Sequence, residues 1–166
     1  MRRLIKFLHT LGAIGMIGAL ATHITLLAVM PETVSPAEYS AWRQAIGAIA
    51  KWLLLPSLGL VLVSGLMAMA FGDQFHSAGW AWAKLALGVV TFEWTLLAVQ
   101  GPAQQAAEAG IRAAAGEVDV AAITEMVRGE WASLWVLLAI ALLNVALGIW
   151  RPRFSRRRRE PGRRLS

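Results

Sequence analysis

Four long apolar runs constrain the fold of this chain more than any other feature of its sequence. Each has about 20 residues or more, which is the length that an α-helix needs to cross the hydrocarbon core of a bilayer. The runs cover residues 4–30, 46–71, 80–100 and 131–150. Inside a bilayer every backbone polar group must be bonded within the chain, which favours helices. The sequence therefore predicts an all-α fold, an integral membrane four-helix bundle.

The composition indicates one membrane domain and excludes several kinds of site. Of the 166 residues, 57% are hydrophobic and 16% are charged. The chain has no cysteine, so it can form no disulfide, iron–sulfur cluster, thiolate ligand or covalent c-type haem attachment. Any redox cofactor must therefore be held without a covalent bond. We expect residues 1–150 to form the four-span domain and residues 151–166 to form a disordered tail.

The basic residues at the two ends of the chain predict its orientation in the membrane. The start, MRRLIK, carries three of them, and residues 151–166 carry eight. An even number of spans places both ends on one side, and the positive-inside rule assigns that side to the cytoplasm. We therefore expect a multi-pass protein of a bacterial-type inner (plasma) membrane. The first apolar run continues well past the ALA at residues 19–21, so we interpret it as a span and not as a cleaved signal peptide.

The same charges predict the partners of the chain. Eight arginines next to a span are typical of a segment that binds anionic lipid headgroups, and we expect the tail to do so. We expect no nucleic-acid binding. Besides the lipid bilayer, a homo-oligomer or a larger membrane complex remains open as a further partner.

Two proline positions bear on the ends and the shape of the spans. Gly101 and Pro102 are expected to end the third span, so that residues 101–130 form an outer loop. Its alanine-rich and then acidic sequence fits one or two short helices on the outer surface. The alternative is that the third span simply continues as a helix beyond the membrane. Pro56, inside the second run, predicts a kink there.

The first span carries two of the three histidines of the chain, His9 and His23. Fourteen residues at 100° each leave an angular offset of only about 40° and a rise of about 21 Å, so both lie on one face. Gly12 lies between them on that face and would let a second backbone or a flat macrocycle approach closely. Imidazole is a common axial ligand of haem iron. The third histidine, His76, lies in the short inner loop and can reach only an inner site near His9.

The remaining ionisable residues in the spans fall at three depths. His9 and Lys84 lie at similar depth near the inner face, whereas His23 and Lys51 lie towards the outer face. Glu93 is nine residues beyond Lys84, about 13 Å deeper and near the midplane. It would relay protons or bond a cofactor propionate, or else serve as a structural carboxyl that bonds a hydroxyl or an amide on the fourth span.

Three short motifs resemble a superfamily of small membrane proteins that includes the HemJ-type protoporphyrinogen oxidases and the CopD copper-resistance membrane domain. In the first, IKFLHTLGAIGMIGAL, the group's Leu-His pair and following glycine are Leu8, His9 and Gly18. In the third, GWAWAKLALGVV, its Lys-Leu pair is Lys84 and Leu85. PSLGLVLVSGLMAMA is similar to its second span, so the likeness covers roughly the first hundred residues.

The resemblance implies haem b as a cofactor, with His9 as a ligand and Lys84 as its partner at the same depth. HemJ-type first spans carry an arginine that GALATHITLLAVM lacks, so the chain is expected to be a different four-span relative. The expected cofactor-binding residues are therefore His9, Lys84, Gly12, His23 and Glu93, and the expected metal ligands are His9 and His76.

Two classes of function follow from these residues. The first is a haem b-binding, redox-active membrane protein, whose electron partner or substrate the sequence does not name. The second is a non-catalytic accessory subunit or a small transporter, in which the polar residues serve to pack the bundle. Copper would be one cargo, since Met67 and Met69 suit Cu(I), but residues two apart on a helix point about 200° apart.

Overall fold

The computed structural model describes residues 2–31, 35–71 and 79–150, and these segments contain helices and no strand. Four helices are long and apolar enough to cross a membrane, which confirms the predicted all-α class and is the pattern of a multi-pass membrane protein. The helical elements are α1 (Arg2–Val29), α2 (Pro36–Ile49), η1 (Ala50–Leu54), α3 (Leu55–Ala70), α5 (Gly79–Thr95), η2 (Leu96–Gln100), α6 (Gly101–Ala114), α7 (Val120–Met126) and α8 (Glu130–Trp150).

Two of the long helices are composite, and a π-helical turn lies within each. In the second helix α2, η1 and α3 follow without a break, and in the third α5, η2 and α6 do so. Pro56 and Pro102 each lie two residues after the end of the π turn. A proline ring clashes with the carbonyl four residues earlier in an α-helix, and the wider π turn relieves that clash. The turns therefore let both helices continue through proline.

The second and third long helices extend beyond the predicted spans, into segments that we expect from sequence on the outer side. The third helix continues through Gly101 and Pro102 to Ala114, which is the second of the two expectations for this segment. The second helix begins at Pro36, because Ser35 caps it and forms a reciprocal capping box with Glu38. Both extensions carry polar residues, so hydropathy alone left them outside the predicted spans.

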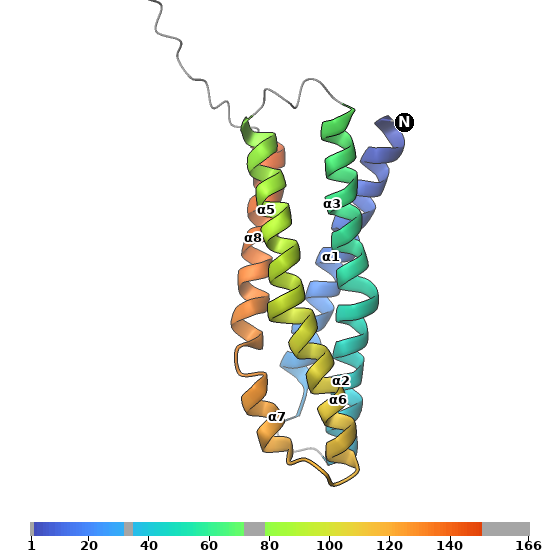
Figure 1. Ribbon diagram of the computed structural model, residues 1–166, viewed down its shortest axis with the longest axis vertical. Helices are drawn as coiled ribbons and strands as arrows, with labels where there is room; N and C mark the ends of the chain where they lie inside the picture. The colour runs from blue at the N-terminus through green and yellow to red at the C-terminus, as the bar shows by residue number, and fades with distance from the viewer. Residues whose placement is uncertain (1, 32–34, 72–78, 151–166) are drawn as a thin grey trace, which may run out of the picture.

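The four long helices lie side by side along the long axis of the molecule (Figure 1). The start of α1, the end of α3, the start of α5 and the end of α8 meet at one end, here called the N-terminal end. The opposite end, here called the α7 end, holds α2, α6 and α7.

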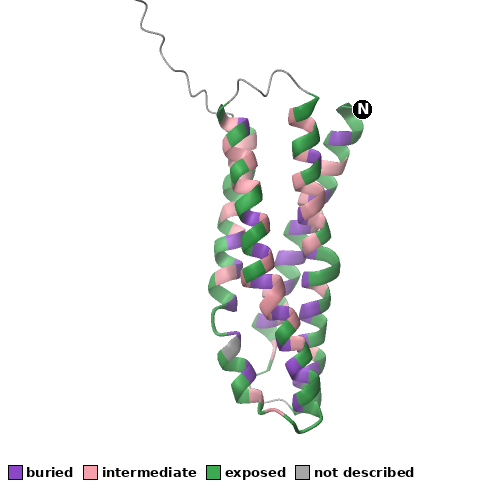
Figure 2. Cartoon of the chain, viewed as in Figure 1, coloured by how far each residue is buried: buried purple, intermediate pink, exposed green. Residues whose placement is uncertain are grey.

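The core is concentrated in the middle of the bundle and towards the α7 end, as the buried residues show (Figure 2). One cluster joins all four long helices and includes Leu20, Ile46, Leu54, Val99, Leu134 and Leu137. A second cluster joins Tyr39, Ala106, Ala109, Ala113, Ile123 and Val127.

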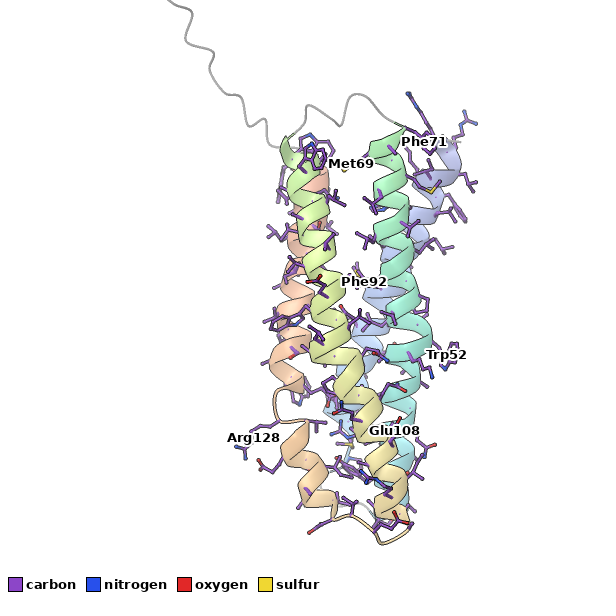
Figure 3. The ribbon with its side chains drawn as sticks, viewed as in Figure 1. Trp52, Met69, Phe71, Phe92, Glu108 and Arg128 are labelled. Carbon is purple, nitrogen blue, oxygen red and sulfur yellow. The ribbon has the colours of Figure 1, made fainter. Side chains whose placement is uncertain are left out.

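Large apolar side chains also cover the outside of the bundle. Trp52 projects outward and is 73% exposed (Figure 3). Leu97 and Trp150 are exposed as well. An apolar outer surface on helices of this length suits contact with lipid chains.

Candidate functional site: a cavity at the N-terminal end

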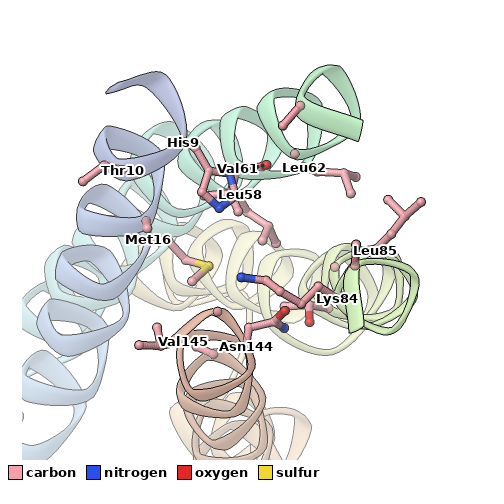
Figure 4. Close-up of a pocket in the computed structure, with 18 of the residues that line it drawn as sticks. His9, Thr10, Met16, Leu58, Val61, Leu62, Lys84, Leu85, Asn144 and Val145 are labelled. Atoms are coloured by element: carbon pink, nitrogen blue, oxygen red, sulfur yellow. Dashed lines mark hydrogen bonds between the residues drawn. The ribbon is translucent and has the colours of Figure 1, made fainter. Parts of the chain in front are cut away.

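A cavity of about 540 Å³ lies between the four long helices in the N-terminal half of the bundle. Its volume falls within the range of roughly 300–1,000 Å³ that is usual for small-molecule sites. Residues of α1, α3, α5 and α8 all line it, and most of them are apolar. The polar or aromatic side chains on its wall are Lys6, His9, Thr10, Trp80, Lys84, Thr91 and Asn144. Figure 4 shows several of these residues around the common space.

His9 is held in one orientation by α3. Its Nδ1 lies 3.1 Å from the carbonyl oxygen of Val61 and 3.1 Å from Oγ of Ser64. Because a carbonyl oxygen only accepts, Nδ1 carries the proton and donates it to Val61. The lone pair of the neutral imidazole is then on Nε2, on a side chain that lines the cavity. A second-shell bond of this kind orients histidines that ligate a metal through the other nitrogen.

Lys84, on α5, and Met16, seven residues after His9 on α1, reach the same space. Figure 4 shows the amine of Lys84 and the sulfur of Met16 directed into the region that His9 faces. A Cβ atom at Gly148 would lie 2.9 Å from Nζ of Lys84, so the lysine passes α8 at a position without a side chain. The structure thus brings together His9 and Lys84, as their predicted depth requires.

The structure places the other predicted site residues away from the cavity wall. Gly12 is buried where α1 meets α3, and a Cβ there would lie 2.9 Å from the carbonyl oxygen of Ser57. The backbone of α3 therefore takes the room that this glycine leaves. Glu93 is exposed on α5 and does not line the cavity, whereas Asn144 does and donates its amide to its own helix. His76 lies outside the described residues.

His23 belongs to a second, fully buried site near the α7 end, here called the ion cluster (His23, Arg43 and Glu130). Its Nε2 donates to Oε1 of Glu130 at 2.9 Å, and Nη1 of Arg43 donates to Oε2 of the same carboxylate at 2.7 Å. Arg43 also donates through Nε to the hydroxyl of Tyr39 at 3.1 Å. The three members come from α1, α2 and α8, so the cluster ties these helices together.

The predicted neighbour of His23 was Lys51, and the structure replaces it with the ion cluster. Lys51 is exposed and lies over the ring of Trp52, with Nζ 5.2 Å from the ring centroid. From sequence, Glu130 falls in the expected outer loop 101–130, and Arg43 falls between the first two predicted spans. Two signals were present: Tyr39 and Arg43 are four residues apart, and Glu130 directly precedes the last apolar run.

The ion cluster balances its charges internally. The guanidinium of Arg43 and the carboxylate of Glu130 form an ion pair, and the carboxylate also accepts a hydrogen bond from Nε2 of His23. Nδ1 of His23 is fully buried and has no hydrogen-bond partner. The geometry of this site is that of a clamp between helices.

No group of three or more His, Asp or Glu side chains in the described part of the chain is arranged to hold a metal ion. Met69 lines the cavity, whereas Met67 does not and is partly exposed, so the two thioethers do not converge. A haem iron needs only one or two protein ligands and is a different case.

Comparisons of the chain with family models, with curated proteins and with solved structures return no match. The likeness of the first hundred residues to the CopD and HemJ group therefore stays a prediction from the residues themselves. Evidence for a function comes from the geometry of the cavity.

Proposed function

We propose that this chain is a multi-pass protein of a bacterial-type inner membrane that binds haem b in the cavity and is redox-active. The single observation that carries the proposal is the state of His9. Its Nδ1–H bond to Val61 fixes the ring on the wall of a large, mainly apolar cavity and leaves Nε2 as the basic nitrogen.

The residues present fit such a group. His9 would hold the iron through Nε2, and the thioether of Met16 would supply a second ligand. Histidine with methionine is an established ligand pair of b- and c-type cytochromes. Haem in such a site supplies one-electron chemistry. Gly65 and Gly88 line the cavity without side chains and keep it wide enough for a flat ring.

The protein's own contribution lies in orientation and solvent exclusion. The hydrogen bond from Nδ1 to the carbonyl of Val61 fixes the orientation of the ring, so that Nε2 is the nitrogen presented to a ligand. Leu58 and Met16, which belong to the buried core, close the deep end of the cavity to water. A dry wall of this kind controls the potential of a redox group.

The orientation of the bundle follows from its charges. From the basic residues at the start and after Trp150 we infer that the N-terminal end, and hence the cavity, faces the cytoplasm. The arginine-rich residues 151–166, which lie outside the described part, would contact anionic headgroups. Assembly into a homo-oligomer or a larger complex is compatible with the apolar outer surface.

The alternative function is a non-catalytic accessory subunit or a small transporter. The ion cluster favours it in part, because it shows polar residues that serve packing. Copper as the cargo has weaker support, because Met67 points away from the cavity that Met69 lines.

The test is a reduced-minus-oxidised absorption spectrum of the full chain, purified in detergent after haem-supplemented expression. We expect a Soret and an α band in the wild type, and we expect His9→Ala to abolish both. Bands retained in His9→Ala would refute the ligand assignment. A wild type without bands would refute haem binding and leave the accessory or transport function.

A further inference from the structure

The polarity of the cavity changes along its length. Lys6 lies four residues into α1 and Lys84 five residues into α5, about 6 and 8 Å from the N-terminal end at 1.5 Å per residue. Met16 and Leu58 lie about 21 and 18 Å from that end by the same measure. The cavity thus has a basic mouth (Lys6, His9 and Lys84) and an apolar floor (Met16 and Leu58).

The charged side chains of the mouth are all of one sign. Among the described residues that line the cavity, two are lysines and one is a histidine, and none is Asp or Glu. Lysine stems pack along apolar walls while the amines stay at the polar end. In a low-dielectric wall, this arrangement creates a positive potential at the mouth that attracts an anion.

We propose that the cavity takes an amphipathic carboxylic acid, with its acid groups at Lys6 and Lys84 and its apolar body against Met16 and Leu58. The inference rests on the proposed function in naming the acid: for haem b the acid groups are the two propionates. Charge-assisted bonds to the two amines then set which edge of the ring faces the mouth. The reverse orientation would bury carboxylates against a thioether and a leucine, and the hydroxyl at that depth, that of Thr91, already donates to the carbonyl of Leu87.

The test compares two ligands of the same shape. The detergent-purified full chain is titrated with haem b and with its dimethyl ester, which keeps the ring and loses both carboxylates. Charge-assisted pairing predicts that the diacid binds at least about tenfold more tightly than the diester. Lys6→Gln and Lys84→Gln should each reduce that ratio, and Lys84→Arg should keep it. Lys51→Gln, a lysine outside the cavity, is the matched control and should leave the ratio unchanged.

A third probe separates this inference from the proposed function. Radiolabelled palmitic acid, with hexadecanol as the uncharged competitor, tests the same acid chemistry without iron. Equal binding of haem and its diester would overturn the acid-end inference and leave haem binding standing. Binding of palmitic acid that depends on Lys6 and Lys84, without any porphyrin binding, would support the acid end and overturn the haem function. Binding of neither class would overturn both.

Discussion

The two histidines of α1 lie on one face of one helix, yet the protein treats them in opposite ways. His23 is fully buried and bonded to Glu130, whose carboxylate also holds Arg43. His9 is partly exposed, bonded to a backbone carbonyl of α3, and faces a cavity. One end of the bundle is closed by an ion cluster and a core, and the other is hollow.

The difference shows that burial of a histidine does not by itself mark a binding site. At His23, Nε2 donates to the carboxylate of Glu130, which is already paired with Arg43, and His23 does not line the cavity. At His9 the bonded nitrogen meets a neutral carbonyl, which leaves the basic nitrogen for a ligand. The group that each ring is bonded to, and whether the ring lines a cavity, therefore distinguish a structural histidine such as His23 from a candidate ligand such as His9.

The largest expected effect is at the clamp. Glu130→Gln removes the charge that compensates buried Arg43, so we expect a loss of about 3–5 kcal/mol in the free energy of unfolding. Chemical denaturation in detergent, followed by tryptophan fluorescence, measures it. Glu125→Gln, which breaks the exposed pair with Arg128, is the control and should change the midpoint little. Equal midpoint shifts in the two variants would show that the ion cluster is no clamp.

An intermediate effect is expected where α1 packs on α3 beside the cavity. Gly12→Ala places a Cβ 2.9 Å from the backbone oxygen of Ser57, and overpacking of this kind costs about 1–3 kcal/mol. Gly18→Ala meets no atom within 4 Å and should be neutral or slightly stabilising. The same denaturation assay compares the two. If Gly18→Ala is the more destabilising variant, the helix contact is misassigned.

The smallest effect is expected at the support of His9. Ser64→Ala removes an oxygen 3.1 Å from Nδ1 but leaves the carbonyl of Val61 in place. We therefore expect haem affinity to fall by about tenfold or less, at the low end for second-shell changes. A haem titration measures the change, and Thr22→Ala, on the exposed face of α1, is the control. A complete loss of haem in Ser64→Ala would mean that the hydroxyl, and not the carbonyl, fixes the ring.

Hydropathy was enough to predict the number and the approximate positions of the long helices. Apolar runs of spanning length predicted four helices and their approximate positions. A proline usually ends a helix. The third helix continues through Pro102 because a π turn precedes it, and hydropathy gives no sign of that turn. The amphipathic start of α2 was missed for the related reason that its polar residues resemble a loop.

The candidate site could also be predicted only in part. The common depth of His9 and Lys84 followed from helical rise alone, and both line one cavity. Rise does not fix rotation, so Gly12 and Glu93 were expected to face the cofactor, whereas one packs on α3 and the other is exposed. The ion cluster depends on contacts between α1, α2 and α8, which no local pattern encodes.

The most direct test of the contrast between the two ends measures haem content and melting temperature on the same preparations of wild type, His9→Ala and His23→Ala. We expect His9→Ala to lose haem while the apoprotein melts close to wild-type apoprotein, and we expect His23→Ala to melt lower while still binding haem. Haem lost from His23→Ala but retained by His9→Ala would contradict this account.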